Sequence, residues 1–296
     1  MDIRVLKYFV SVAQEQNMTK AANLLHISQP ALSRQIADLE TELGTKLLTR
    51  SHRKIQITPE GYYLLERAQE IIGLVDKTTH TLQKQDTISG TLDIGAGESD
   101  QLGPVMQAVK NTIHKYPEIH VNFHSGDSSL TFSELDSGVL EFSVIMGDFN
   151  LSNYNQLELP TKNHWGVLMR KDEPLAQKDS ISPSDLLGRP ILSSRQATKQ
   201  FFDDWSDGLS AQFDFIGTYN LFYNASLLVK TGACIALTFG GLADVSSESE
   251  LTFKPLTPDL TGTNTLIWSK GRNLPKANQI FLDELQKILK YEKTKK

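Results

Sequence analysis

The chain has 296 residues and a net charge of −5, and 39% of its residues are hydrophobic. This length allows two or three domains, and the hydrophobic content argues against a disordered chain. No apolar run reaches the roughly 20 residues that a membrane-spanning helix needs. Asp2, Arg4 and Lys7 lie within an amphipathic pattern, which argues against a signal peptide, and the single cysteine fits a reducing compartment, so we expect a cytoplasmic protein.

The single cysteine, Cys234, excludes an intrachain disulfide. Its apolar neighbours predict a buried strand residue, and a redox sensor is the less favoured alternative. The charge is unevenly distributed, because residues 1–60 contain eight basic and six acidic residues, or +2, and the remainder therefore carries −7. The attraction between a protein and a phosphate depends on the charges within a Debye length of about 8–10 Å, and not on the net charge of the chain. The first 60 residues are therefore the candidate nucleic-acid-binding part.

Three amphipathic helices are predicted within the first 43 residues. The first spans about 3–14, and the second spans about 19–25 with Thr19 as its N-cap. Ser28 is a suitable N-cap for the third helix, and Pro30 fits its first turn. The third helix carries an apolar stripe formed by Leu32, Ile36, Leu39 and Leu43. Two helices joined by a tight turn in this way favour a helix-turn-helix.

The other face of the third helix carries side chains that can read bases. Gln can pair with adenine, Arg with guanine and Ser with either. We expect the first turns of this helix to touch base edges or the adjacent backbone through Gln29, Pro30, Ser33 and Arg34, and Ser28 is a further candidate DNA-binding residue. Thr19, at the start of the preceding helix, is expected to contact a phosphate or the minor groove.

A basic hairpin follows these helices. Two short strands are predicted at 47–48 and 55–57, and residues 46–54 hold four basic groups and no acidic one. Arg50, Arg53 and Lys54 are expected to contact phosphates or the minor groove. A plain three-helix core with a solvated charge run is the alternative. The helix pair and the basic wing together favour a winged helix-turn-helix, with double-stranded DNA as its partner.

A long linker helix is predicted at 59–86. Thr58, Pro59 and Glu60 supply an N-cap, a proline at the first helical position and an acid in the first turn. Spacings of three and four form a heptad seam of Leu65, Ala68, Ile72, Val75 and Leu82. The seam could pack on its own domain, but we favour a dimer, which would place two recognition helices on a two-fold operator. Residues 87–90 are the predicted hinge.

At this point the sequence resembles LysR-type transcriptional regulators. The matching segments are 1–10, 18–22, 28–36, 43–50 and 57–61, and a weaker resemblance continues beyond residue 90. The resemblance implies a bacterial activator or repressor that reads a small-molecule effector, a tetramer built from dimers, and RNA polymerase as a further candidate partner. It implies an α/β fold with a winged helix-turn-helix at 1–58 and a two-lobed effector domain at 91–296, similar to periplasmic solute-binding proteins.

Beyond residue 90 strands and helices alternate, which predicts parallel, doubly wound sheets. Lobe I is expected at about 91–160 and 266–296, and lobe II at about 161–265. The expected strands are 91–96, 120–124, 141–146, 166–169, 190–193, 213–218, 233–238 and 265–268. The expected helices are 104–116, 129–137, 184–187, 198–209, 221–231 and 276–291.

Ligands of open parallel sheets bind beyond the carboxyl ends of the strands. The residues that follow the strands therefore form the predicted effector site: Ser99, Asp100, Ser125, Ser128, Gly147, Ser193, Ser194, Thr218, Tyr219, Thr238 and Phe239. The resemblance implies a carboxylate ligand at Ser99 and Ser128, whereas a simple N-cap is the alternative for each hydroxyl. Phe239 stands where the family commonly has proline, and Trp165, Phe222 and Tyr219 could add aromatic surface or pack in the core.

The predicted site is rich in acids. Glu98, Asp100, Asp127 and Asp148 follow the strands, and only Arg195 is basic. This balance favours a neutral, zwitterionic or cationic effector.

Enzymatic chemistry is not indicated. The sequence has no glycine-rich phosphate loop, since Gly95-Ala96-Gly97 lacks the rest of that fingerprint, and no Gly-x-Ser-x-Gly elbow. The seven histidines show no metal-ligand spacing. His120 and His124 would share one face of a strand, where a structural role is at least as favoured. We therefore expect a binding protein without a catalytic residue, cofactor or metal.

Overall fold

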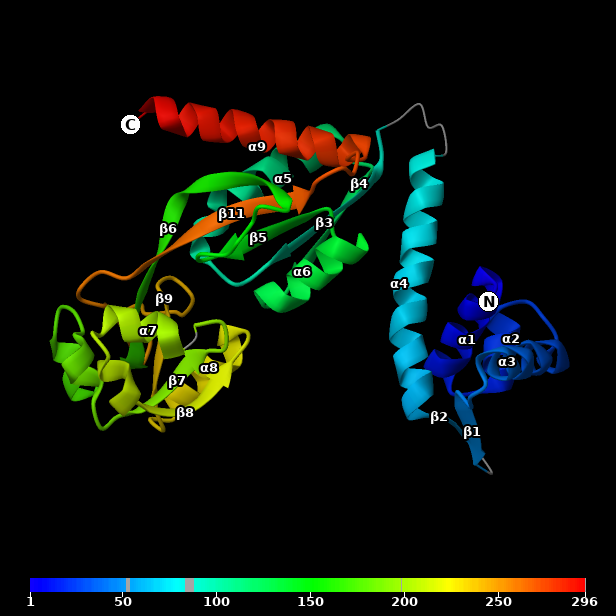
Figure 1. Cartoon of the computed structure of the whole chain (residues 1–296), viewed down its shortest axis with the longest axis horizontal. Coiled ribbons are helices and arrows are strands. Elements are labelled where there is room, and N and C mark those ends of the chain that lie inside the picture. The colour runs from blue at the N-terminus through cyan, green and yellow to red at the C-terminus, as the bar shows by residue number, and fades with distance from the viewer. Residues whose placement is uncertain (52–53, 83–87, 198, 296) are drawn as a thin grey trace. The chain divides into compact units, whose positions relative to one another are not determined.

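The computed structural model describes residues 1–51, 54–82, 88–197 and 199–295. The chain divides into two compact units, Met1–Lys84 and Gln85–Lys296, and Figure 1 shows the elements of both. Within the described ranges, the helices are too short or too polar to cross a lipid bilayer.

The first unit is built from three helices and a hairpin: α1 (Ile3–Glu15), α2 (Met18–Leu24), α3 (Gln29–Leu43), β1 (Leu48–Ser51) and β2 (Lys54–Ile57). The strands pair antiparallel, with Leu48 opposite Ile57. The prediction that Thr19 caps α2 is wrong. Asn17 has the extended backbone of an N-cap, and its side chain accepts hydrogen bonds from the amides of Thr19 and Lys20, each at 3.0 Å.

A buried carboxylate ties α3 to the wing. Glu40, only 8% exposed, accepts hydrogen bonds from the amides of Leu47 (3.0 Å) and Leu48 (3.1 Å) and pairs with Lys46 at 2.6 Å. Burial alone would raise the pKa of Glu40, but Lys46 and the two amides together hold that pKa below its ordinary value. The wing is therefore fixed to α3 by a charge-assisted network.

The first turn of the linker helix α4 (Pro59–Leu82) contains a position, Gly61, that only glycine can fill. A Cβ on Gly61 would lie 2.1 Å from the carbonyl oxygen of Leu47, so glycine is needed for α4 to pack on the start of the wing. Thr58 Oγ1 donates to the carbonyl of Lys46 at 2.7 Å and accepts from the amide of Gly61 at 3.0 Å. The direction in which α4 leaves the wing is thus set by local contacts.

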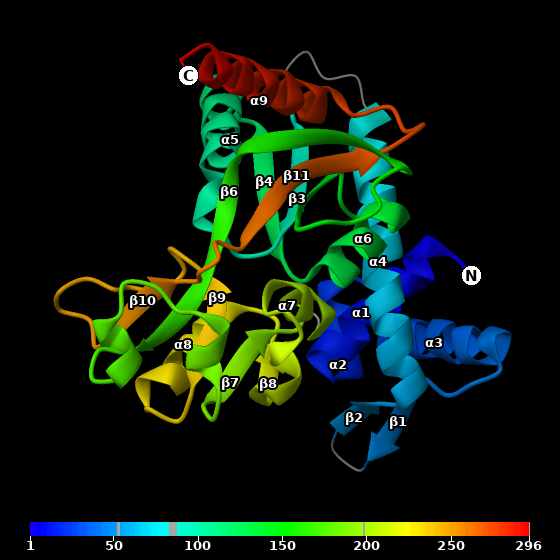
Figure 2. The ribbon, with the colours of Figure 1, turned by 60° about the vertical axis from the view of Figure 1, so that its left-hand side comes forward.

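The second unit contains one continuous mixed sheet, with strand order β4-β3-β5-β11-β6-β9-β7-β8 and β10 paired to β6. Its strands are β3 (Gly90–Ala96), β4 (Ile119–Ser125), β5 (Phe142–Met146), β6 (Tyr154–Arg170), β7 (Pro190–Ser194), β8 (Asp214–Tyr219), β9 (Ile235–Phe239), β10 (Leu251–Pro255) and β11 (Thr261–Ser269). The 17-residue β6 runs through both lobes, and the 9-residue β11 leads from the junction back into lobe I, as Figure 2 shows.

The prediction of parallel sheets holds only in part. Strands β3, β4 and β5 of lobe I are parallel, and so are β7, β8 and β9 of lobe II. However, β11 is antiparallel to β5 and β6, and β6 is antiparallel to β9 and β10. The reason is that the chain crosses between the lobes within strands, first along β6 and then back along β11.

Lobe I is a three-layer structure. Helices α5 (Gly103–Lys115) and α9 (Lys276–Lys295) pack on one face of the sheet, where Phe142, Val144 and Leu266 are buried. Helix α6 (Ser128–Ser137) packs on the other face, against Ile145 and Ile267. Successive strand residues thus supply opposite layers.

Lobe II is layered in the same way. Helix α7 (Lys199–Trp205) covers the face with Val167, Ile191 and Ile235, and α8 (Phe222–Lys230) covers the face with Leu192 and Ala236. Short 3-10 turns complete the unit: Asp100–Leu102, Pro174–Gln177, Pro183–Leu186 and Leu209–Gln212. The expected helices at 184–187 and 198–209 were therefore wrong in type or length.

Candidate functional site

Helix α3 presents an exposed polar face at its start. Gln29, Pro30 and Arg34 are exposed and Ser33 is half-buried, while Leu32, Ile36 and Leu39 are buried in the core of the unit. Ser28 is the N-cap of α3 and accepts from the amide of Ala31 at 3.4 Å. Arg34 forms no ion pair with any residue that the structure describes. Its guanidinium is therefore available for an external acceptor.

The other predicted DNA-contacting residues belong to the wing and to the start of α2. Arg50 belongs to β1 and Lys54 to β2, but the structure does not describe their side chains. Arg53 lies outside the described residues. Thr19 is exposed in the first turn of α2, beside Lys20. Exposed donors, a buried apolar stripe and a tethered hairpin are what a helix needs to enter a DNA groove.

The predicted seam of α4 is divided between two environments. Ala68 is completely buried in the core of its own unit, and Leu65 and Ile72 pack against the same core. Ala68 therefore has no surface for a partner helix, which corrects the seam at this position. Residue 87, where the predicted hinge begins, lies outside the described residues. The side chain of Leu82, the last predicted seam residue, lies outside them as well.

The exposed apolar residues of α4 include one predicted seam residue, Val75. They are Tyr62, Tyr63, Ile71, Leu74 and Val75, with exposures of 38% to 69%. Ile71, Leu74 and Val75 lie within about 100° of one another around the helix axis at 3.6 residues per turn.

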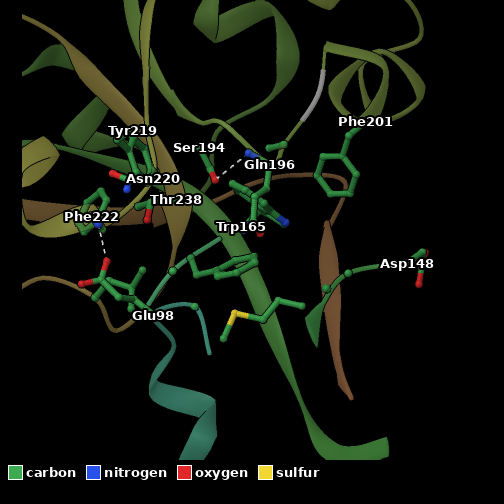
Figure 3. Close-up of a pocket in the computed structure, with 18 of the residues that line it drawn as sticks. Glu98, Asp148, Trp165, Ser194, Gln196, Phe201, Tyr219, Asn220, Phe222 and Thr238 are labelled. Carbon is green, nitrogen blue, oxygen red and sulfur yellow. Dashed lines mark hydrogen bonds between the residues drawn. The ribbon is translucent and has the colours of Figure 1, made fainter. Parts of the chain in front are cut away.

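A cavity of about 260 Å³ lies between the two lobes of the second unit, beyond the carboxyl ends of the strands. Five of the predicted effector residues line it: Gly147, Ser194, Tyr219, Thr238 and Phe239. Trp165 forms the middle of its wall, with ring centroids 4.5 Å from Phe239 and 5.5 Å from Phe201 (Figure 3). A concave, largely aromatic site with a few polar groups is typical of small-molecule binding.

The polar groups of this cavity are partly unsatisfied. Thr238 is 1% exposed, its hydroxyl lies beside that of Tyr219, and its Oγ1 accepts no hydrogen bond from any residue in the described ranges. The Tyr219 hydroxyl donates to the carbonyl of Leu237 at 2.8 Å, and burial raises the pKa of Tyr219. Thr238 therefore offers a buried hydroxyl to an occupant of the cavity.

Two contacts join the lobes beside the cavity. Glu98, which follows β3 in lobe I, accepts a hydrogen bond from the amide of Phe222, the first residue of α8 in lobe II (Figure 3). Asp127 of lobe I pairs with Arg195 of lobe II, and it also caps α6 by accepting from the amide of Leu130 at 3.1 Å. The lobes are thus bridged by two of the chain's own carboxylates.

The remaining predicted effector residues lie elsewhere. Ser99 caps the turn at Asp100–Leu102 and donates to Asn163 Oδ1 at 2.5 Å, so its hydroxyl is already used. Ser99, Asp100 and Ser125 line a neighbouring cavity of about 360 Å³ in place of the interlobe one. Ser128 starts α6, where Asp127 is the cap.

Two further expected residues face away because side chains alternate along a strand. Ser193 precedes Ser194 in β7 and is buried on the opposite face, and Thr218 precedes Tyr219 in β8 and is exposed. Gln196, Phe201 and Met146 line the cavity and were missed. Gln196 could have been found, because it follows β7 by two residues. In the described ranges, no group of three His, Cys, Asp or Glu side chains could hold a metal ion.

Comparisons with known proteins support this arrangement. Residues 3–62 match the family described as "Bacterial regulatory helix-turn-helix protein, lysR family", and residues 85–290 match the "LysR substrate binding domain". The second match alone covers more than half of the chain.

Similar proteins are known from several organisms. A "Hydrogen peroxide-inducible genes activator" of Pectobacterium carotovorum subsp. carotovorum is 31% identical over 198 residues, which cover 65% of this chain and 64% of that relative. The chain thus matches less than two thirds of that relative's length. A "Probable RuBisCO transcriptional regulator" of Thalassiosira pseudonana is 25% identical over 299 residues, with 96% of each chain covered.

Solved structures share the fold. CbnR, described as a LysR family transcriptional regulator, superposes with a TM-score of 0.73 at 18% identity, covering 98% of this chain and 99% of CbnR. CbnR solved in complex with its target DNA gives a TM-score of 0.71 at 19% identity, covering 97% and 100%. At these identities the likeness concerns the fold.

Proposed function

This chain belongs to the LysR family of transcriptional regulators, and we propose that it binds a two-fold symmetric DNA site through α3 and the wing while its second unit senses a small molecule. The observation that carries the DNA-binding part is the exposed face of α3, where Arg34 has no ion-pair partner among the described residues and Gln29 lies exposed in the first turn. Arg and Gln at such positions can read guanine and adenine edges.

The sensing part rests on the interlobe cavity. Its wall comes from the strand ends of both lobes, and it holds the buried hydroxyl of Thr238. An occupant would touch both lobes and would therefore favour one relative orientation of them. A ligand shifts such an equilibrium only by binding one state more tightly than the other. We propose that this shift changes the spacing of the DNA-binding heads and so the bending of the DNA.

The proposal assigns residues 1–58 to DNA binding, 59–86 to the linker and dimer contact, 87–90 to the hinge and 91–296 to the effector domain. A dimer formed through α4, and a tetramer built from dimers, would present several heads to one regulatory region. RNA polymerase is a candidate partner of the DNA-bound assembly, and the cytoplasm is where a chromosomal regulator would act. The protein is a binding protein in this proposal, and not an enzyme.

We propose a bound molecule as the signal, and not oxidation of a thiol. The name of the Pectobacterium relative refers to hydrogen peroxide. Cys234 is the single cysteine of this chain, it is 6% exposed, and burial raises the pKa of its thiol. A thiol of this kind is protected from rapid oxidation, because the thiolate is the reactive form.

The test is a genome-wide pull-down of DNA fragments with the purified full-length protein, followed by a search for a shared site. A two-fold symmetric motif is the expected result, and Arg34→Ala should lose its enrichment under the same conditions. Equal recovery of random fragments by both proteins, in the presence and absence of cell extract as a source of effector, would contradict the proposal.

A further inference from the structure

The chemistry of the interlobe cavity identifies the class of its ligand. We propose that the cavity binds a small organic cation, an amine attached to an apolar ring, and that Glu98 and Asp148 supply its countercharge. This inference rests on the proposed sensing function and deepens it.

The charges on the cavity wall are of one sign. Glu98 and Asp148 line it, and none of the lining side chains that the structure describes is basic. Figure 3 places the two carboxylates on either side of Trp165. Arg195 lies close in sequence to the lining residues Ser194 and Gln196, but it does not line the cavity, and its charge is paired with Asp127. An anion entering here would therefore meet two carboxylates.

The N-terminus of α8, which would attract an anion, is already occupied by the carboxylate of Glu98. The N-terminus of a helix favours negative charge through its free amides and dipole. The N-cap of α8, Leu221, offers no side-chain acceptor, and Glu98 of the other lobe accepts the amide of Phe222 in its place. A ligand carboxylate would have to displace Glu98 from that amide, whereas a cation can approach Glu98 without breaking the bond.

The rest of the wall suits a cation with an apolar body. Trp165, Phe201, Tyr219 and Phe239 surround the cavity, and aromatic faces attract ammonium groups. The Thr238 hydroxyl is buried and its oxygen accepts no hydrogen bond within the described ranges, so it can accept an N–H from a ligand. A volume of about 260 Å³ exceeds the roughly 150 Å³ of a cavity that holds benzene, which leaves room for a ring and a short substituent.

The test compares three probes of nearly equal shape: 2-phenylethylamine, 2-phenylethanol and phenylacetate. Their dissociation constants for the full-length protein are measured by calorimetry and by tryptophan fluorescence. The amine is expected to bind at least about tenfold more tightly than the alcohol, as one cation–π contact and one countercharge allow. Phenylacetate is expected to bind most weakly.

Charge-neutral variants locate the effect. Glu98→Gln keeps an acceptor for the Phe222 amide but removes the charge, and Asp148→Asn does the same for the other carboxylate. Each should weaken binding of the amine by about twofold to fivefold and leave binding of the alcohol nearly unchanged, because Asp148 is exposed and Glu98 is half-buried. The controls are Glu118→Gln and Asp214→Asn, which remove exposed acids of the same domain that do not line the cavity.

Three results would overturn the inference: tighter binding of phenylacetate, equal binding of all three probes, or no binding of any probe. The same protein samples are tested for binding to the DNA site from the pull-down. If the wild type binds the DNA site but does not bind the amine most tightly, only the inference of a cationic ligand is rejected. If the wild type does not bind the DNA site, the proposed function as a regulator is rejected.

Discussion

The carboxylate of Glu98 accepts a hydrogen bond from the backbone amide of Phe222, so a residue of lobe I caps the first turn of a helix in lobe II. Asp127 and Arg195 form a second bridge between the lobes. Both bridges lie beside the cavity, so an occupant of the cavity would lie next to the contacts that join the lobes.

Removal of the Glu98 cap should destabilise the second unit. Glu98→Ala leaves the start of α8 without its side-chain acceptor, and a lost N-cap costs about 0.5–2 kcal/mol. Urea unfolding followed by tryptophan fluorescence measures the loss, since all three tryptophans, Trp165, Trp205 and Trp268, lie in this unit. Glu98→Gln should retain most of the stability. An unchanged midpoint for Glu98→Ala would show that the bond contributes nothing.

Arg34 should decide base preference. Arg34→Ala is expected to reduce affinity for the DNA site by about 1–3 kcal/mol and to relax specificity at one base pair. Fluorescence anisotropy with the site and with single-base variants measures both effects. Arg4→Ala is the matched control, because Arg4 is an exposed arginine of α1 that pairs with Asp2 at 3.0 Å. Equal affinity and equal preference of the Arg34 variant would remove Arg34 from the base-reading set.

The Glu40 network should make the first unit sensitive to acid. The folded state holds the pKa of Glu40 below its ordinary value, so the stabilisation is present above about pH 4.5 and is lost as the pH falls through the folded pKa. Glu40→Gln is expected to lose about 1–3 kcal/mol at pH 7. The gap between wild type and variant in urea unfolding, followed by circular dichroism, should narrow at pH 3.5. A gap that is constant with pH would mean that the charge plays no part.

The first unit was largely predictable because its signals are local. Ser28, Pro30 and the apolar stripe of α3 fix a helix start and a buried face within 15 residues. The error at the start of α2 has a physical reason. Asn17 and Thr19 can both cap a helix, and the backbone conformation that decides between them depends on the preceding turn. Ala68 shows the same limit, since a heptad pattern cannot tell an intrachain core from a partner helix.

The cavity was predictable only where strand ends converge. The rule that ligands lie beyond the carboxyl ends of strands found Tyr219, Thr238 and Phe239. It could not find Phe201, which reaches the cavity from α7 and depends on packing against Trp165. The antiparallel path of β6 was missed for a related reason. Hydrophobic patterns report which residues are buried, but not which distant strand lies beside them.

The thiol of Cys234 should react slowly in the folded chain. It packs in the core cluster of lobe II that also contains Phe222 and Leu168, and its raised pKa keeps it protonated near neutral pH. A chromogenic disulfide reagent should label it much faster in urea than in buffer. Hydrogen peroxide should leave DNA binding of the wild type and of Cys234→Ala unchanged. Rapid stoichiometric labelling of the native protein would contradict this expectation.

The exposed apolar face of α4 should hold the dimer together. Leu74 is 46% exposed between Ile71 and Val75, and pairing with a partner helix would remove all three from water. Leu74→Asp would place a charge in that contact and forfeit the burial of a leucine, so the dimer dissociation constant should rise at least about tenfold. Sedimentation velocity across a concentration series measures the change. Gln69→Asp adds the same charge at an exposed position on the far side of α4 and should leave the dimer intact. Dissociation by both variants would point to a general effect of charge on the helix, and dissociation by neither would place the dimer contact elsewhere.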